Sequence, residues 1–236
     1  MTVSHPDPTP AQPQVVDRRT GVDGEVVLRR HGTLWQIIAN GTFLMDTSNG
    51  ESERLLISAT LDRLRAHAPH PTPVRPALLI GGLGVGFSLA EACAHPDWSR
   101  IEVVEREEAV IDWHRDGPLG AFTARALADP RTELVHADLL EHLRTTDRRY
   151  DALCLDIDNG PDWTVSQDND TLYSPTGLAD CARCLNPGGT LAVWSAQPSP
   201  KFDEALRDNG FVRVGPEEVP VARGVPDVIH FAAKPA

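Results

Sequence analysis

Residues 77–105 read ALLIGGLGVGFSLAEACAHPDWSRIEVVE. This stretch begins with a short apolar run at Ala77 to Gly81, continues with a helical pattern at Phe87 to Ala94, and ends in a second apolar run at Ile101 to Glu105. Short apolar runs of this kind predict buried strands, and two strands joined by a helix form a βαβ unit with a right-handed crossover. The stretch therefore predicts an α/β fold with a mostly parallel sheet.

Three alternating glycines, Gly82, Gly84 and Gly86, join the first predicted strand to its helix. Glycine permits unusual backbone angles and lets the main chain approach a ligand at the carboxyl edge of a sheet. The second strand ends in Glu105, 19 residues after Gly86, where a carboxylate can accept hydrogen bonds from both hydroxyls of a ribose. Each feature alone also fits a structural role: the glycines can form a tight strand-to-helix turn, and Glu105 can be a solvated acid at a strand end. Together they predict a nucleoside site.

The alternation of strands and helices continues to the end of the sequence. Further strands are predicted at Glu133 to His136, Ala152 to Asp156 and Thr190 to Ser195. Further helices are predicted at Glu107 to Arg115, Leu139 to Arg144, Pro175 to Leu185 and Lys201 to Asn209. The last two strands, Phe211 to Val214 and Val228 to Ala232, are expected to pair in antiparallel fashion and close the sheet.

The sequence before residue 77 has a different pattern. Residues 1–24 contain four prolines among their first 13 positions and few large apolar side chains, which predicts a flexible tail. Residues 25–68 contain short β-prone runs around the hairpin signal Asn40-Gly41, followed by an amphipathic helix. The proline-rich connector that follows is the predicted boundary of a main domain spanning residues 77–236.

Composition narrows the possible partners. The formal net charge is -12, which disfavours nucleic acid because phosphate binding depends on clustered lysine and arginine. The sequence has neither a run long enough to span a bilayer nor a secretory leader, so we expect a cytoplasmic protein that does not bind membranes. Its four cysteines are expected to be free thiols, and Cys181 and Cys184 lack the further ligands of a zinc site, so no metal is predicted.

The third strand of the βαβ series is followed by Ala137-Asp138-Leu139. The carboxylate of Asp138 can accept a hydrogen bond from the exocyclic amine of an adenine, while Leu139 packs on the ring. Asp138 can equally be the N-cap of the next helix, and the two roles are compatible.

Several of these segments resemble one known family. They are the GGLGVG loop, the VVE that ends the second strand, HADLLEHL, YDALCLDIDNGP, and LYSPTGLADCARCLNPGGTLAVWS. They are similar to the spermidine synthase family of aminopropyltransferases, and above all to its short bacterial relatives, the spermidine synthase-like proteins. The resemblance covers residues 77–196 well and residues 33–64 loosely. It implies a Rossmann-like class I methyltransferase fold, with a mostly parallel seven-stranded sheet, helices on both faces and a small N-terminal β-hairpin unit. An NAD-binding dehydrogenase fits the Asp138 segment less well.

The resemblance also implies an active site at the fourth strand. Asp156 stands where the family keeps the carboxylate that orients the attacking amine or receives its proton, and Asp158 lies two residues on. The alternative is that these acids only fix the turn at Asn159-Gly160-Pro161. Beyond them, a loop with Trp163, Asp168, Asp170 and Tyr173 is either a cover that closes over substrate or a surface connector, and Trp194 fills the core or lines the pocket floor.

The sequence departs from the family at three places. Gly84 replaces the loop acid that pairs with the amine of decarboxylated S-adenosylmethionine, Asn159 replaces a second acid, and no Tyr-His pair is recognisable in Leu55 to Ala59. These changes favour methyl transfer from S-adenosylmethionine to a small amine-type acceptor. Aminopropyl transfer from the decarboxylated cosubstrate is the first alternative, and a noncatalytic nucleoside-binding homologue is the second. The N-terminal hairpin is a candidate surface for a homodimer.

Overall fold

The computed structural model describes residues 12–67, 75–157, 159–162, 170–221 and 224–236. Its strands form two sheets. The four-stranded sheet contains, in spatial order, β1 (Gln14–Gly21), β2 (Gly24–His31), β3 (Leu34–Ala39) and β4 (Thr42–Asp46). The seven-stranded sheet contains, in spatial order, β10 (Val212–Val219), β11 (Asp227–Ala233), β9 (Leu185–Ser195), β8 (Tyr150–Leu155), β5 (Ala77–Gly81), β6 (Arg100–Glu105) and β7 (Thr132–His136).

Five neighbouring strands of the large sheet run parallel, in the spatial order β9, β8, β5, β6 and β7. In contrast, β10 and β11 are antiparallel to their neighbours. This arrangement confirms the predicted α/β fold, including the antiparallel pair that closes the sheet. In the described part of the chain, five helices connect the parallel strands: α2 (Phe87–Ala94), α3 (Glu108–Arg115), α4 (Gly120–Leu127), α5 (Leu139–Thr145) and α6 (Pro175–Cys184). A further helix, α7 (Pro200–Asp208), leads from β9 to β10. The short helix α4 was not predicted.

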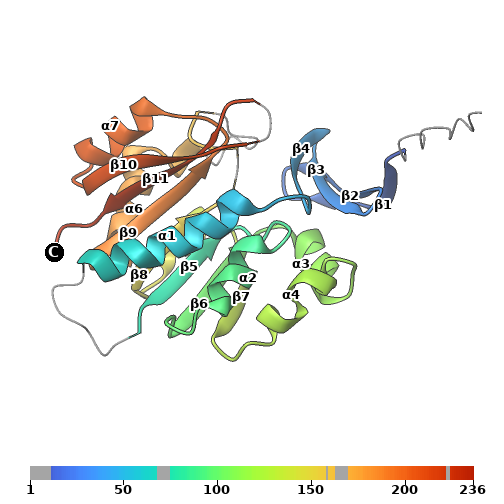
Figure 1. Cartoon of the computed structure of the whole chain (residues 1–236), viewed down its shortest axis with the longest axis horizontal. Helices are drawn as coiled ribbons and strands as arrows, with labels where there is room; N and C mark the ends of the chain where they lie inside the picture. The colour runs from blue at the N-terminus through green and yellow to red at the C-terminus, as the bar shows by residue number, and fades with distance from the viewer. Residues whose placement is uncertain (1–11, 68–74, 158, 163–169, 222–223) are drawn as a thin grey trace, which may run out of the picture.

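The large sheet is covered on both faces, as Figure 1 shows. Successive side chains of a strand point to opposite faces. On β5, Leu78 and Ile80 join the core formed with α1 (Glu51–His67), α2, α3 and α4, while Leu79 joins the core formed with α5, α6 and α7. Because both faces of β5 are buried, this strand is apolar throughout rather than alternating, which is why it was recognisable from sequence.

Two expectations for the amino-terminal region are wrong. Residues 14–21 are not part of a flexible tail, because β1 pairs with β2 along almost its whole length. Most of β1 is solvent-exposed, so the strand is held by backbone hydrogen bonds to β2. Its side chains show no apolar pattern from which a strand could be predicted. Helix α1 packs against β8, β9 and β11 of the large sheet, and therefore belongs with that sheet and not with the hairpin unit. The Asn40-Gly41 hairpin is confirmed, with both residues at positive φ.

Polar contacts fix the small sheet beside α3. The indole nitrogen of Trp113 donates to Asp17 of β1 at 2.8 Å, and Arg19 pairs with Asp112 at 2.6 Å. In the turn between β1 and β2, the backbone N–H of Val22 donates to Glu107 at 3.1 Å. These contacts hold the β1–β2 turn over the carboxyl ends of β5 and β6.

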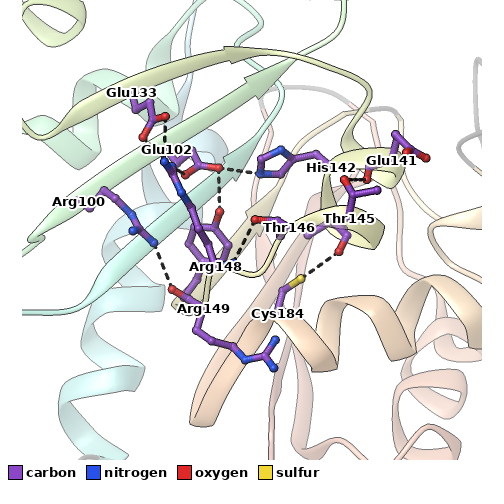
Figure 2. A network of polar contacts seen from close by, with 12 residues as sticks. Arg100, Glu102, Glu133, Glu141, His142, Thr145, Thr146, Arg148, Arg149 and Cys184 are labelled. Atoms are coloured by element: carbon purple, nitrogen blue, oxygen red, sulfur yellow. Dashed lines mark hydrogen bonds and ion pairs between the residues drawn. The ribbon is translucent and has the colours of Figure 1, made fainter.

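The opposite edge of the large sheet carries a network of charged groups around Glu102, which is fully buried. Figure 2 shows how the side chains converge. The hydroxyl of Tyr150 donates to Glu102 at 2.7 Å, Arg148 pairs with both Glu102 and Glu133, and Nε2 of His142 lies 2.7 Å from Glu102. The network ties β6, β7 and β8 together near their amino ends, which leaves their carboxyl ends open to a ligand.

None of the helices in the described part of the chain is both long and apolar enough to cross a membrane.

Candidate active site

A cavity of about 190 Å³ lies at the carboxyl ends of the parallel strands, between the large sheet and the small one. The loops after β5, β6, β7 and β8 form its floor, and the β1–β2 turn with parts of β2, β3 and β4 covers it. Ligands of open α/β sheets bind at this edge, where the strand order reverses around the first strand of the series. Here that strand is β5, which lies between β6 and β8.

The glycine loop after β5 brings two strand ends into contact. Gly82 has φ +91°, and a Cβ atom on it would lie 2.3 Å from the carbonyl oxygen of Asp156 at the end of β8. Gly86 has φ +94° and begins α2. Only glycine adopts these angles without strain while letting the backbones approach so closely. Gly82 and Gly84 line the cavity, whereas Gly86 does not. The predicted contact of this loop with a nucleoside stays a prediction.

Gly84 faces an unexpected partner. The thioether sulfur of Met45, from β4 of the small sheet, would lie 2.3 Å from a Cβ atom at Gly84, and the backbone N–H of Val85 points to the same sulfur at 3.2 Å. On the other side of the loop, Nε2 of the buried His114 lies 2.8 Å from the carbonyl oxygen of Gly84. Burial lowers the pKa of His114, so its neutral form is favoured. Neither contact was predictable from the sequence, because each joins segments that are distant in the chain.

Glu105 closes β6 and lies against the glycine loop. Its carboxylate accepts hydrogen bonds from the backbone N–H groups of Leu83 at 2.9 Å and Glu107 at 2.8 Å. Burial raises the pKa of Glu105, while these two hydrogen bonds oppose the rise. The carboxylate is thus fixed before any ligand arrives and still lines the cavity.

Asp138 and Leu139 lie next to it, at the end of β7. Asp138 accepts a hydrogen bond from the backbone N–H of Glu141 at 3.0 Å and is the N-cap of α5. Both Asp138 and Leu139 also line the cavity. The cap bond occupies one carboxylate oxygen, so the N-cap role and the adenine-binding role remain compatible.

Asp156 follows β8, and its backbone N–H donates to Gly81 at 2.9 Å. Its side chain lines the cavity. Burial raises the pKa of Asp156 well above its ordinary value, and the nearby carboxylates of Glu53 and Asp227 raise it further. Glu53 comes from the first turn of α1 and Asp227 from the start of β11. Neither was predicted, because an acid in an amphipathic helix or at a strand end carries no signal of its own.

The remaining predicted residues differ in where the structure places them. Tyr173 does not line the cavity but packs edge-on against Phe202, with ring centroids 5.5 Å apart. Trp194, in contrast, lines the cavity, which was one of its two expected positions, the other being the core. Asp158, together with Trp163 and Asp168, lies outside the described residues.

The cavity is strongly anionic. Among the described residues that line it, Arg106 is the one basic side chain, and it already pairs with Asp23 and Glu107. Seven lining residues are acidic: Asp23, Glu25, Glu53, Glu105, Glu107, Asp138 and Asp156. Within the described part of the chain, no group of three or more His, Cys, Asp or Glu side chains is arranged to hold a metal ion. The arrangement suits an organic ligand that carries positive charge and no carboxylate.

Solved structures with the same fold include a spermidine synthase from Thermotoga maritima, with a TM-score of 0.72 and 18% identity, covering 93% of this chain and 72% of that one. Another is a spermidine synthase in complex with the transition-state analogue AdoDATO, with a TM-score of 0.75 and 19% identity, covering 93% of this chain and 73% of that one.

Curated relatives point to the same family. Polyamine aminopropyltransferase 1 of Pseudomonas aeruginosa is 33% identical over 132 residues, which are 55% of this chain and 43% of that protein. Polyamine aminopropyltransferase of Sodalis glossinidius is 32% identical over 134 residues, which are 56% of this chain and 44% of that protein. The matches span less than half the length of these relatives. The family model described as the spermine/spermidine synthase domain matches residues 63–206, more than half of the sequence, so the chain belongs to this family.

Proposed function

We propose that the chain is an aminopropyltransferase that uses decarboxylated S-adenosylmethionine and a small amine acceptor. The observation that carries this proposal is the charge of the cavity, whose described lining residues include seven acids and one base, the already paired Arg106. Decarboxylated S-adenosylmethionine is a dication, with a sulfonium and an ammonium group. S-adenosylmethionine has an additional carboxylate, which would have to be desolvated among other carboxylates, and the described lining residues include no free cation to pair with it.

Aminopropyl transfer replaces methyl transfer as the favoured reaction. The sequence-based preference for methyl transfer depended on the absence of an acid at Gly84. The relatives named above are aminopropyltransferases, which favours the other alternative. An acid is also available from another element, since Glu53 lines the same cavity and its carbonyl oxygen accepts a hydrogen bond from Ser88, just after the glycine loop.

In the proposed reaction, Glu105 holds the ribose hydroxyls, and Asp138 with Leu139 holds the adenine. The nitrogen of the acceptor amine attacks the aminopropyl carbon bonded to the sulfonium sulfur. A C–N bond forms, the C–S bond breaks with its electron pair going to sulfur, and 5′-methylthioadenosine leaves. Asp156 takes the proton that the amine loses. Its raised pKa makes it a better proton acceptor than an ordinary aspartate, provided that it is ionised when the amine binds.

Calorimetry with the two cosubstrates tests the proposal. We expect decarboxylated S-adenosylmethionine to bind at least about tenfold more tightly than S-adenosylmethionine, a difference of about 1.4 kcal/mol. A preference for S-adenosylmethionine would support methyl transfer instead. Binding of neither would support the noncatalytic homologue.

Substitution of Asp156 tests its role. In Asp156→Asn we expect turnover to fall by about 10² to 10⁴, because the general base is lost, while the Kd of the cosubstrate changes little. Single-turnover assays with 1,4-diaminobutane or spermidine as acceptor measure the first quantity, and calorimetry measures the second. Unchanged turnover would remove Asp156 from the mechanism.

A further inference from the structure

Side chains contact the glycine loop after β5 from both of its sides. Two backbone N–H groups of the loop point to Glu105 and to the sulfur of Met45, which both line the cavity. The carbonyl oxygen of Gly84 instead lies 2.8 Å from Nε2 of His114. His114 belongs to α3, is 1% exposed and does not line the cavity. Any effect of His114 on a ligand must therefore pass through the loop.

The partners of the two ring nitrogens of His114 fix the direction of its hydrogen bonds. A carbonyl oxygen only accepts hydrogen bonds, so Nε2 carries a hydrogen and donates it to Gly84. In the neutral imidazole Nδ1 is then an acceptor, and it lies 2.7 Å from the hydroxyl of the buried Thr123. That hydroxyl donates to Nδ1, because its other acceptor, the carbonyl oxygen of Leu119, is farther away at 3.3 Å. Burial lowers the pKa of His114, which favours this neutral form.

The third glycine of the loop leaves room for these two side chains. A Cβ atom on Gly86 would collide with the methyl carbon of Thr123 and would lie 3.2 Å from Cε1 of His114. Gly86 does not line the cavity, so a ligand does not explain its missing side chain. Close packing of the loop backbone on α3 and α4 does explain it.

We propose that His114, oriented by Thr123, is a positioning residue that holds the Gly84 carbonyl away from the cavity and so fixes the wall against which the nucleoside binds. This inference rests on the nucleoside site of the proposed function and extends it to residues that do not touch the ligand. A glycine-rich backbone has many accessible conformations, which it must give up when a ligand binds. The hydrogen bond from His114 restricts the loop beforehand, and affinity is retained because less entropy is lost on binding.

Two amide substitutions separate the two hydrogen bonds of His114. In His114→Gln the amide nitrogen is as many bonds from Cβ as Nε2 of histidine, so it can still donate to Gly84. In His114→Asn the shorter amide can accept from Thr123 but does not reach Gly84. Both variants remove a buried ring and should have a lower Tm than the wild type. The control is His230→Asn, which removes an equally buried histidine outside the cavity lining while keeping a donor for Asp203.

Calorimetry of the full chain with 5′-methylthioadenosine at pH 8 measures the consequence for binding. We expect His114→Asn to weaken binding about tenfold or more, whereas His114→Gln stays within about threefold of the wild type. His230→Asn should bind like the wild type. A role confined to stability would lower the Tm of all three variants and leave their affinities unchanged. Equal affinities in the two His114 variants would overturn the inference.

Nitrogen-15 NMR of the histidine rings tests the inference on the wild-type chain, without any variant. The chemical shifts of the two ring nitrogens distinguish the Nε2–H tautomer, the Nδ1–H tautomer and the imidazolium. At pH 8 we expect His114, assigned through its own backbone signals, to be the Nε2–H tautomer. The Nδ1–H tautomer could not donate to Gly84, so its presence would overturn the inference.

Failure of this inference and failure of the proposed function give different results. A chain that binds 5′-methylthioadenosine with the expected difference between the two His114 variants, but transfers no aminopropyl group, would contradict the proposed function alone. An active aminopropyltransferase in which both variants bind the nucleoside equally would contradict the inference alone. A wild type that binds no nucleoside would contradict both.

Discussion

At the scale of single residues, Glu105 shows how this fold prepares a site before the ligand binds. Both of its carboxylate oxygens are oriented by backbone N–H groups, one from the glycine loop and one from the turn into α3. Each oxygen keeps a further lone pair for a ribose hydroxyl. Because the acceptor positions are already fixed, the proposed binding of a nucleoside would cost little side-chain entropy at Glu105.

Replacement of this carboxylate by an amide should affect both binding and stability. In Glu105→Gln the new NH₂ group faces one of the two backbone donors, so a buried N–H loses its acceptor at a cost of about 1 to 3 kcal/mol. We expect the free energy of unfolding to fall by that amount and the affinity for 5′-methylthioadenosine to fall by about tenfold. Urea unfolding and calorimetry measure the two effects.

The matched control is Glu108→Gln, an exposed acid in the first turn of α3 that faces away from the cavity. It should change both quantities little. Equal affinity for the nucleoside in Glu105→Gln and the wild type would show that Glu105 does not hold the ribose.

At the scale of elements, the site depends on how closely the ends of β5 and β8 approach each other. The backbone of Gly82 meets the carbonyl oxygen of Asp156 where any side chain would collide with it. The same approach places the glycine loop and the candidate base on one wall of the cavity. Two requirements therefore fall on Gly82, a positive φ and the absence of a Cβ atom.

Alanine at two glycines should separate these requirements. Gly188→Ala is the control, because Gly188 has φ +77° and no atom within 4 Å of the added Cβ; its free energy of unfolding should fall only by the cost of backbone strain, about 1 to 2 kcal/mol. Gly82→Ala has similar backbone strain and must also displace the Asp156 backbone, which adds about 1 to 3 kcal/mol. We expect it to lose nucleoside binding, whereas the control keeps it. Equal unfolding free energies for the two variants would show that β5 and β8 can separate freely.

At the scale of the whole molecule, the acidic cavity has a cost in stability. The formal net charge is -12, and part of that charge lies in the partly desolvated group of Asp156, Glu53 and Asp227. A carboxyl whose folded pKa is raised binds its proton more tightly in the folded than in the unfolded state. Its contribution to the free energy of unfolding is therefore complete at low pH and is lost as pH rises through the folded pKa.

This sign predicts a pH-dependent effect of Asp156→Asn. As pH rises from about 5 to about 8, the free energy of unfolding of the variant should increase relative to that of the wild type, because only the wild type must ionise a buried acid. Comparison of variant and wild type at each pH cancels the opposite trend from His114, whose pKa is lowered by burial. The exposed Asp147→Asn is the control. A difference that does not change with pH would mean that Asp156 titrates normally in the folded protein.

Sequence alone was sufficient for the large sheet and for the set of residues that gather at the carboxyl ends of its strands. The strand β5 and the helix α2 begin and end at the predicted residues, and Gly82, Glu105 and Asp138 meet at one edge. The reason is physical: buried parallel strands are continuous apolar runs, and the loops that follow them share one edge of the sheet. Local spacing therefore specifies which side chains gather there.

Tertiary structure decided the rest. The exposed strand β1 is ordered only by its partner β2, and Met45 comes to Gly84 only because the small sheet folds over the loop. Ser52 and Asp227 are 175 positions apart, yet they form one hydrogen bond beside the candidate base. No periodicity or spacing encodes such a meeting, because it depends on how α1 packs across the large sheet. The acidic group beside Asp156 therefore became visible only in the folded molecule.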